Sequence, residues 1–328
     1  MATTVRVATF NLENFDDPGP TGQPTLAQRI ALMRPQLERL RADVLCLQEV
    51  NTQQVNGVRT FAALDELVDG TPYAGFSRAW TTVAAGTMPL DVRNLVILSR
   101  FPISSSRQIK HEITPRPAYR RVTAIPPDVN AIEITWERPI LLADVTPPDG
   151  STLHVLNVHL KSKIPTDIPG QHPNQFLWQS ASGWAEGSFI SAMKRVGQAL
   201  EARMVIDSLF DSDPQARIVA CGDFNADIDE VPLEAIRGDV ENTANPLLIS
   251  RLMIPCERNI PASARFSLYH HGRPVMLDHV LASRPLLAYW QNSAAHNEVL
   301  HDESVAFALD TTFPESDHAP VVAEFVFP

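Results

Sequence analysis

The chain contains few cysteines, and their number and spacing exclude two common roles. There are three in 328 residues, at positions 46, 221 and 256. An odd number leaves at least one cysteine unpaired, and no spacing among them suits a zinc site. Cys46 and Cys221 lie inside apolar runs, where a free cysteine behaves as a small core residue. We therefore expect buried thiols, which are typical of a reducing compartment such as the cytoplasm.

The sequence also lacks the long apolar segments of membrane proteins. No run reaches the about 18 apolar residues that a membrane-spanning helix needs. The first strand-like pattern begins by Val5, which leaves no room for the charged and apolar regions of a signal peptide. We therefore expect a cytoplasmic protein without a membrane span.

The chain has fewer basic residues than acidic ones. The chain has 27 Lys and Arg residues against 38 Asp and Glu residues, a formal net charge of -11. This balance argues against broad, sequence-independent binding of nucleic acid, which rests on clustered basic side chains. It still allows a nuclease, because a bound metal can supply the local positive charge. Acidic charge also simply favours solubility.

Apolar runs and helical periodicities alternate along the chain. A chain of this length, with 44% hydrophobic residues, can form one large α/β domain or two. It contains no internal repeat and no linker, so we expect one catalytic domain over residues 1–328. The expected strands are Val5–Phe10, Val44–Leu47, Leu95–Leu98, Ile140–Val145, Leu153–Val158, Ile218–Cys221, Val275–Ala282 and Val321–Phe327. Several are uniformly apolar, which predicts sheets covered by helices in a layered α/β body.

Three segments have helical spacing of apolar residues, and two long polar segments separate the strands. The helices are expected at 26–40, 61–68 and 190–204. Pro35 should kink or split the first of them. Residues 99–127 form a polar stretch rich in Pro and Arg. Residues 161–188, which include Phe176, Trp178 and Trp184, are predicted to form a long loop whose aromatic side chains either pin it to the body or face a substrate.

Six short polar motifs border the apolar runs. They are Phe10-Asn11-Leu12-Glu13, Leu47-Gln48-Glu49-Val50, Asn157-Val158-His159-Leu160, Cys221-Gly222-Asp223-Phe224-Asn225, Leu277-Asp278-His279-Val280 and Ser316-Asp317-His318-Ala319-Pro320-Val321. The first four follow the C-terminal ends of runs, and the last two stand at the starts of later runs. If the late strands are antiparallel to the early ones, the polar side chains gather at one rim, where rigid strands can hold a catalytic geometry.

The residue types at this rim predict a divalent-cation site. Glu49, with Asn11 or Glu13 beside it and Asp317 nearby, offers carboxylate and carbonyl oxygens. Such ligands suit Mg²⁺ or Mn²⁺ rather than zinc. The sequence therefore predicts an acidic pocket in which a cation can meet a phosphate.

Two histidines and a strand-end pair complete the predicted pocket. His159 and His318, which lie beside carboxylates, are better suited to contact phosphate or carry protons than to bind the metal. Asp223 and Asn225 point to the same side because side chains alternate along a strand. Such a pair can orient an attacking water and hold a phosphoryl oxygen. The alternative is that Gly222-Asp223 is an ordinary strand-ending turn.

Together the six motifs resemble those of the endonuclease/exonuclease/phosphatase superfamily, whose fold is like that of pancreatic deoxyribonuclease. The resemblance extends from Val5 to Phe327. It implies a four-layer α/β sandwich with two facing mixed sheets flanked by helices. It also implies hydrolysis of phosphoesters with a divalent metal.

For the metal site, the resemblance implies four residues. Asn11 matches the family's first-strand Asn near the metal, and Glu49 matches its principal metal ligand. Glu13 stands where some members have a second acidic ligand. Asp317 matches a residue that helps at the metal site.

For catalysis, the resemblance implies five residues. Asp223 matches the residue that orients or deprotonates the attacking water, and Asn225 matches its phosphate-holding neighbour. Asp278 matches the carboxylate that pairs with the final histidine, His318. His159 resembles the histidine of deoxyribonuclease-like, sphingomyelinase-like and inositol-phosphatase-like branches. Branches specialised for abasic DNA tend to carry Tyr and Asn in that strand, so this chain departs from them.

Two basic residues are further candidates for substrate binding. Arg138 precedes the strand that ends at Val145, in a region where relatives place a supporting Arg or Glu. It can equally lie over the strand surface with its charge in water. Lys161 either contacts phosphate or is solvated.

The expected reaction is in-line attack of water on a phosphoester, with Mg²⁺ as cofactor and Mn²⁺ as a plausible substitute. The first hypothesis is a phosphodiesterase or nuclease. The second is a phosphomonoesterase acting on a small phosphorylated metabolite or lipid head group, and the third is a catalytically inactive binding module. The substrate is therefore a nucleic acid or a small phosphoester, and fold alone does not decide which. Oligomeric state has no signal in the sequence.

Overall fold

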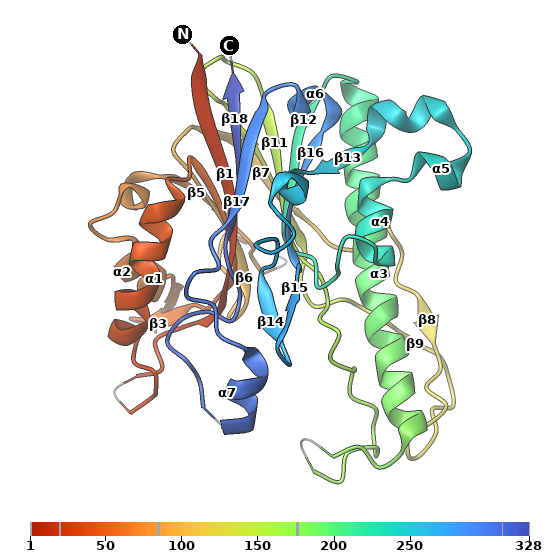
Figure 1. Cartoon of the computed structure of the whole chain (residues 1–328). Helices are drawn as coiled ribbons and strands as arrows, with labels where there is room; N and C mark the ends of the chain where they lie inside the picture. Colours follow the sequence, from red (N-terminus) through yellow and green to blue (C-terminus); the bar gives the residue numbers. More distant parts are fainter. Residues whose placement is uncertain (1, 20, 84–85, 175–176, 310, 328) are drawn as a thin grey trace.

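Two six-stranded mixed sheets face each other in the computed structural model, which describes residues 2–19, 21–83, 86–174, 177–309 and 311–327 (Figure 1). In spatial order the first sheet consists of β17 (Trp290–Ala295), β18 (Val321–Phe327), β1 (Thr3–Phe15), β2 (Val44–Val50), β6 (Asn94–Ser99) and β5 (Ser77–Trp80). The second consists of β13 (Met253–Pro255), β16 (Asp278–Ser283), β12 (Arg217–Asp223), β11 (Leu153–His159), β10 (Ile140–Val145) and β7 (Ile103–Ile109). In each sheet one central pair is parallel, β1 with β2 and β11 with β12, and the other neighbours are antiparallel.

Helices and short hairpins connect these strands. The α-helices are α1 (Leu26–Leu40), α2 (Ala62–Val68), α3 (Ala181–Ser212), α4 (Val231–Arg237), α5 (Val240–Thr243), α6 (Arg284–Leu287) and α7 (Glu303–Leu309). The 3₁₀ turns are η1 (Pro72–Gly75), η2 (Pro246–Arg251) and η3 (Cys256–Asn259). The hairpins pair β3 (Gln53–Val55) with β4 (Val58–Thr60), β8 (Ala118–Tyr119) with β9 (Ile132–Glu133), and β14 (Leu268–His270) with β15 (Arg273–Val275).

Three apolar cores hold four layers together. One lies between the two sheets, one packs α1 and α2 on the outer face of the first sheet, and one packs α3 and α4 on the outer face of the second (Figure 1). The side-chain alternation of the strands produces this arrangement. Along β1, Val5 and Val7 enter the core between the sheets, whereas Ala8 and Phe10 face the helices. The four-layer sandwich expected from the sequence is thus confirmed.

A buried polar cluster ties the two sheets together. The Asn157 amide on β11 donates to the carbonyl oxygens of Leu47 (3.0 Å) and Val96 (3.1 Å) in the first sheet. Its own carbonyl oxygen accepts from Gln48 Nε2 at 2.7 Å, and Gln48 also donates to Thr9 Oγ1 at 3.0 Å. Because buried polar groups are costly when unpaired, this cluster fixes the position of β11 relative to β2.

The prediction of a loop over residues 161–188 is wrong for the last part of this segment, because helix α3 begins at Ala181. The Ser180 side chain caps the helix by accepting a hydrogen bond from Gly183 N. The glycines that suggested a loop allow close packing instead. A Cβ at Gly183 would lie 2.3 Å from Gln171 Oε1, and one at Gly187 would lie 2.5 Å from the carbonyl oxygen of Thr166.

Three smaller expectations differ from the structure. Helix α1 is continuous across Pro35, so the predicted split is wrong, and the alternative, a kink, stays a prediction. The edge strand β7 lies within the polar stretch 99–127, where no strand is expected. The strand expected over Val275–Ala282 is divided between β15 and β16. The aromatic side chains of the long connection are distributed between a loop, which holds Trp178, and α3, which holds Trp184; Phe176 lies outside the described residues.

The three cysteines are buried free thiols, as expected. Within the described part of the chain, none of the helices combines the length and the apolar character needed to cross a membrane.

Candidate active site

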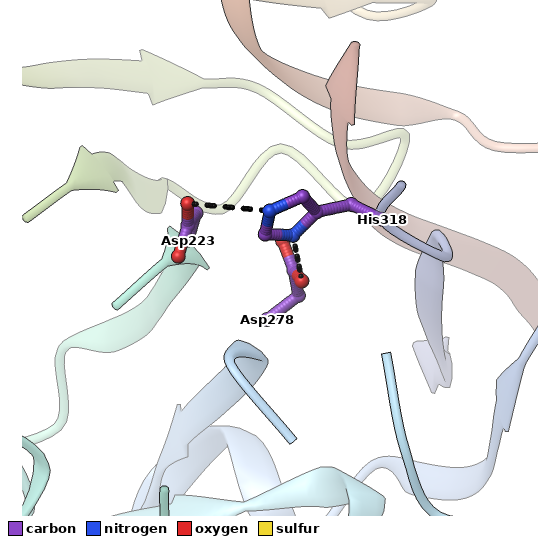
Figure 2. Close-up of side chains that lie close together, drawn as sticks. All are labelled: Asp223, Asp278 and His318. Atoms are coloured by element: carbon purple, nitrogen blue, oxygen red, sulfur yellow. Dashed lines mark hydrogen bonds and ion pairs between the residues drawn. The ribbon is translucent and has the colours of Figure 1, made fainter. Parts of the chain in front are cut away.

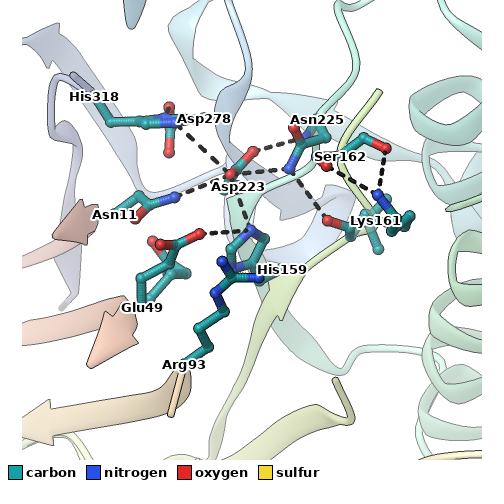
Figure 3. Close-up of polar contacts among 12 residues, drawn as sticks. Asn11, Glu49, Arg93, His159, Lys161, Ser162, Asp223, Asn225, Asp278 and His318 are labelled. Atoms are coloured by element: carbon teal, nitrogen blue, oxygen red, sulfur yellow. Dashed lines mark hydrogen bonds and ion pairs between the residues drawn. The ribbon is translucent and has the colours of Figure 1, made fainter. Parts of the chain in front are cut away.

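The polar motifs converge at one rim of the two sheets (Figure 3). Asp223, the last residue of β12, is the register partner of Asp278, the first residue of β16. His318 lies just before β18, which is antiparallel to β1. The antiparallel late strands therefore bring the starts of β16 and β18 to the ends of β12 and β1.

These residues surround a pocket of about 590 Å³. It is lined by Asn11, Glu13, Asn14, Glu49, Arg93, Arg138, His159, Ser162, Lys163, Ile164, Asp223, Asn225, Leu268, His270, Val275, Leu277, Glu303, Asp317 and His318. All the residues predicted from the sequence contribute to this lining except Asp278 and Lys161. Asp278 is fully buried behind His318.

Asp223 lies at the centre of the hydrogen bonds in the pocket. Its Oδ2 accepts hydrogen bonds from Asn11 Nδ2 and Asn225 Nδ2, both at 3.0 Å, and lies 3.2 Å from His159 Nε2 (Figure 3). Its Oδ1 accepts from the backbone N–H of Asn225 at 2.8 Å. Burial raises the pKa of Asp223 to about 7, while the charge of His318 opposes that rise. A carboxylate with this pKa can accept a proton near neutral pH.

Gly222 allows β12 to approach β11 at this point. A Cβ at Gly222 would lie 1.9 Å from the carbonyl oxygen of Val158, and the φ angle of Gly222 is +144°. The glycine is therefore required by the backbone contact that places Asp223 beside His159.

His318 and Asp278 form a buried pair (Figure 2). His318 Nδ1 lies 2.7 Å from Asp278 Oδ2, and its Nε2 lies 3.9 Å from Asp223 Oδ2. Burial alone would lower the pKa of His318, but the charges of Asp278, Asp223 and Asp317 outweigh it and hold that pKa well above 6.5. The ring is therefore a positively charged donor that faces Asp223.

His159 differs from His318 because its pKa is lowered rather than raised. Burial, followed by the charges of Arg138 and His318, lowers the pKa of His159 well below 6.5. Its Nδ1 is buried without a hydrogen-bond partner among the described residues, as suits an unprotonated nitrogen. The neutral ring thus presents Nε2–H to Asp223, and Glu49 Oε1 lies 3.6 Å from the same nitrogen.

Several site residues have a left-handed backbone. The φ angles are +49° at Glu13, +46° at Asn14, +58° at Glu49, +56° at Arg93 and +47° at Asn225. The ladder between β1 and β2 shifts register after Asn11, and the ladder between β2 and β6 shifts around Glu49. Such irregularities redirect side chains and are costly unless the surroundings impose them, and they concentrate at functional sites.

The acidic wall of the pocket fits a cation. Burial and then the charge of Asp317 raise the pKa of Glu13 to about 8, and burial is also the main cause of the raised pKa of Asp317. Asp317 Oδ1 is buried and, within the described chain, has no hydrogen-bond partner. Glu49 and Asn11 line the same pocket, and the side-chain oxygen of Asn11 accepts a hydrogen bond from the backbone N–H of Glu13 at 2.9 Å. Like charges crowded around an unsatisfied carboxylate oxygen are relieved by a bound cation.

A second, more compact group also has metal-ligating side chains. Among the described residues, the ligand atoms of Asp223, Asp278 and His318 all lie within 4.8 Å of one another, which makes them a possible metal site. The acidic side chains predicted as ligands, Glu13, Glu49 and Asp317, do not form such a compact group.

The two candidate basic residues are placed differently. Arg138 is buried, donates from Nη1 to the carbonyl oxygen of Leu160 at 3.3 Å, and lies 3.9 Å from Glu49 through Nη2. Lys161 Nζ donates to the carbonyl oxygens of Ser162 (3.3 Å) and Ile164 (2.9 Å) and thus holds the loop that forms one pocket wall. Burial lowers the pKa of Lys161 to about 8.

Comparison with known proteins establishes the family and the fold. The model of the Endonuclease/Exonuclease/phosphatase family matches residues 8–318. The chain belongs to this family. Its members are phosphoester hydrolases that depend on a divalent metal. No curated protein matches the chain.

Solved structures with the same fold cover nearly all of the chain. Truncated TDP2 from Caenorhabditis elegans is 15% identical and has a TM-score of 0.58, with coverage of 99% of this chain and 98% of that one. A protein of the endonuclease/exonuclease/phosphatase family from Bacteroides thetaiotaomicron is 15% identical with a TM-score of 0.58, covering 100% and 96%. The 3′ phosphatase NExo from Neisseria, bound to a product DNA hairpin, is 17% identical with a TM-score of 0.52, covering 98% and 99%. At these identities the likeness establishes the fold alone.

Sequence reasoning missed Arg93 and Asn14, which also line the pocket of this family member. Arg93 immediately precedes β6, which is antiparallel to β2 and so begins at the same rim. The rule that identified Asp278 at the start of a late strand would have found Arg93 as well. Asn14 lies one residue beyond Glu13 and donates its backbone N–H to Glu49 Oε2 at 2.9 Å.

His279, next to Asp278, supports the site from behind. Its Nδ1 contacts the Glu257 carboxylate, and its Nε2 lies 2.9 Å from the carbonyl oxygen of Ala226. The ring also meets Phe224 edge-on, with centroids 5.4 Å apart. Both nitrogens of His279 therefore face acceptors, and the residue anchors the turn that carries Asp223. Its position at the second place of a buried strand gave no sequence signal for this role.

Proposed function

We propose that this chain is a divalent-metal-dependent phosphodiesterase, and specifically a nuclease, that cleaves by in-line attack of water. The observation that carries the proposal is the environment of Asp223. Three nitrogen atoms, from Asn11, Asn225 and His159, lie within 3.2 Å of its Oδ2 at the floor of an open pocket. A carboxylate held in this way, with an acidic wall on one side, can position and deprotonate a water molecule.

The donors around Asp223 supply the phosphoryl contacts. His318 is a positively charged N–H donor and His159 is a neutral one. The Asn225 amide donates to the carbonyl oxygen of Leu160 at 3.1 Å and to Asp223 Oδ2 at 3.0 Å, so it would release Asp223 when it contacts a phosphoryl oxygen. Donors fixed in advance around developing negative charge are usually the largest contribution to such catalysis. In this scheme Asp278 orients His318 and keeps it charged.

We assign the metal to the wall formed by Glu49, Glu13, Asp317 and Asn11. The bound ion, Mg²⁺ or Mn²⁺, would act as a Lewis acid on a phosphoryl oxygen. Mg²⁺ usually retains several waters and binds through one or two carboxylates, which an open pocket wall allows. The compact group of Asp223, Asp278 and His318 suits it less well, because Asp278 is fully buried and its Oδ2 already pairs with His318 Nδ1.

Hydrolysis of bis-p-nitrophenyl phosphate, compared with the matching monoester in Mg²⁺, Mn²⁺ and EDTA, tests the proposal. We expect metal-dependent cleavage of the diester in preference to the monoester. Asp223→Ala and His318→Ala should each lose roughly 10²-fold or more in turnover with the fold intact. Asp65→Ala, an exposed carboxylate on α2, is the matched control and should retain full turnover.

Other outcomes have definite meanings. Preference for the monoester would replace the diesterase with a phosphomonoesterase, the activity named for the Neisseria relative. Normal turnover in folded Asp223→Ala would refute the assignment of the water-positioning residue. Absence of turnover, together with no metal binding, would favour an inactive binding module.

The proposal also includes the domain organisation and the cellular location of the protein. We propose one catalytic domain over residues 1–328, supported by the family match from 8 to 318. The buried free thiols of Cys46, Cys221 and Cys256 support a cytoplasmic location.

A further inference from the structure

The pocket has a buried floor, and an exposed arginine, Arg93, lies at its rim. On the floor, Asp223 is 1% exposed, His159 is 2% exposed, and Asn225 and His318 are each 9% exposed. Arg93 lines the same pocket but is an exposed residue. A phosphoryl group seated among the floor donors would leave Arg93 facing the part of the substrate that protrudes from the pocket.

Arg93 is held in place from both its backbone and its side chain. Its backbone N–H donates to Asn51 Oδ1 at 2.8 Å, and its φ angle is +56°. Its Nε donates to Asn14 Oδ1 at 3.1 Å. Asn14 in turn donates its backbone N–H to Glu49 Oε2. Asn14 therefore connects the Arg93 guanidinium group to Glu49, the proposed metal ligand.

The outer edge of the Arg93 guanidinium is unused. In the part of the chain that the structure describes, neither Nη group of Arg93 has a hydrogen-bond or ion-pair partner. The other arginine and lysine side chains of the lining are occupied, since Arg138 contacts Leu160 and Glu49, and Lys163 pairs with Glu230 at 2.7 Å. A planar fork of donors with its Nε already fixed is suited to bind a phosphate through both Nη groups.

We propose that Arg93 binds a second phosphate, next to the one that is hydrolysed, and thereby selects a nucleic-acid strand with consecutive phosphodiesters over compounds with a single phosphate. This inference rests on the proposed phosphodiesterase function. In a strand, the phosphate next to the scissile one would extend out of the pocket towards Arg93, the exposed arginine of its lining. The acidic net charge of -11 makes such a local contact valuable, because the molecule as a whole repels phosphates.

The kinetic test compares the dinucleotide TpT, which has one phosphate, with the trinucleotide TpTpT, which has two. We expect Arg93→Ala to lower the ratio of kcat/KM for TpTpT to that for TpT by about tenfold, mainly through KM, as for loss of one charge-assisted hydrogen bond. Arg93→Lys should recover only part of the ratio, because Lys lacks the fork. Asn14→Ala, which removes the acceptor for Nε, should lower the ratio in the same direction.

Arg116→Ala is the matched control. Arg116 is exposed, pairs with Glu133 at 2.8 Å, and does not line the pocket, so the ratio should not change. Equal losses on TpT and TpTpT in Arg93→Ala would place Arg93 on the reacting phosphate and overturn the proposal.

A binding measurement separates this inference from the proposed function. Fluorescence anisotropy with a fluorescein-labelled oligothymidylate strand in EDTA requires no turnover. Loss of one phosphate contact should reduce the slope of log K against log salt by about 0.7 in Arg93→Ala. That reduction, without hydrolysis of either substrate by the wild type, would leave the phosphate site standing and reject the phosphodiesterase. An unchanged slope, or no binding by the wild type, would overturn the role of Arg93 whatever the kinetics show.

Discussion

His318 Nδ1 lies 2.7 Å from Oδ2 of Asp278, a carboxylate that is fully buried at the start of β16. The other nitrogen of the ring points towards Asp223, which ends the neighbouring strand β12. A single histidine therefore lies between two carboxylates from adjacent strand ends. The pair makes this buried loop residue a charged donor with a fixed direction, because Asp278 leaves its ring one favourable orientation.

Replacing Asp278 with Asn should remove the charge and keep the shape. We expect Asp278→Asn to lower kcat on a phosphodiester by about 10²-fold, since His318 loses both its orientation and its stabilised positive charge. Steady-state kinetics and a thermal unfolding curve check this together. A variant that keeps wild-type kcat with a native unfolding transition would show that His318 acts without Asp278.

Metal binding should stabilise the fold through Glu49. A ligand that binds only the folded state adds about 2.7 kcal/mol to stability at one hundred times its Kd, so Mg²⁺ or Mn²⁺ should raise the thermal unfolding midpoint. We expect Glu49→Gln to lose most of that rise. Glu303→Gln is the control, because Glu303 lines the pocket but pairs with His270. If Asp278→Asn rather than Glu49→Gln abolished the rise, the metal would bind at the compact group instead.

The candidate site could largely be located from the sequence because its residues stand at the ends of buried strands. Asn11, Glu49, His159 and Asp223 each follow an apolar run. His159 and Asp223 end their strands, Glu49 is the last residue but one of β2, and Asn11 lies four residues before the end of β1, so all four lie near one rim of the sheets. Side-chain direction could be predicted only for Asp223 and Asn225, from the alternation of side chains along a strand. For Arg93 the strand-start rule gives the position before β6, whereas its left-handed backbone and its contact with Asn14 could not be predicted.

The fold was predictable where apolar periodicity is strong and unpredictable where tertiary contacts override local signals. Gly183 and Gly187 suggested a loop, yet both lie in helix α3. Glycine is needed there because Gln171 and Thr166 pack where a Cβ would stand, a contact that the local sequence does not reveal. Strand β7 is mostly exposed and polar, so it has no alternation to detect. Its pairing with β10 alone defines it.

The contacts of Asn157 in the core are also tertiary contacts that its local sequence does not reveal. They lead to a prediction about stability. Asn157→Ala should lower the free energy of unfolding by roughly 3 kcal/mol, because Gln48 Nε2 and the carbonyl oxygens of Leu47 and Val96 would lose their buried partner. Urea unfolding measures this loss. A change below about 1 kcal/mol would mean that water enters the cluster and replaces the amide.

His279 should make stability depend on pH. Burial alone would lower its pKa, but the charge and hydrogen bond of Glu257, followed by Ala226 and Asp278, raise that pKa above 6.5. A base whose folded pKa is raised contributes stability that is complete below the unfolded value and is lost as pH rises through the folded value. The free energy of unfolding should therefore decline above about pH 6.5, and His279→Gln should lack this part of the decline.

The difference between wild type and variant isolates the effect of His279. Glu13, with a pKa of about 8, also titrates in this range, but its contribution is common to both proteins and cancels. Glu257→Gln should remove the same part of the decline, because it takes away the charge that raises the pKa of His279. Urea unfolding of the three proteins across this pH range measures the differences. If the wild type and His279→Gln kept a constant difference in stability from below pH 6.5 upwards, His279 would be neutral in the folded protein, and its contact with Glu257 would be an ordinary hydrogen bond.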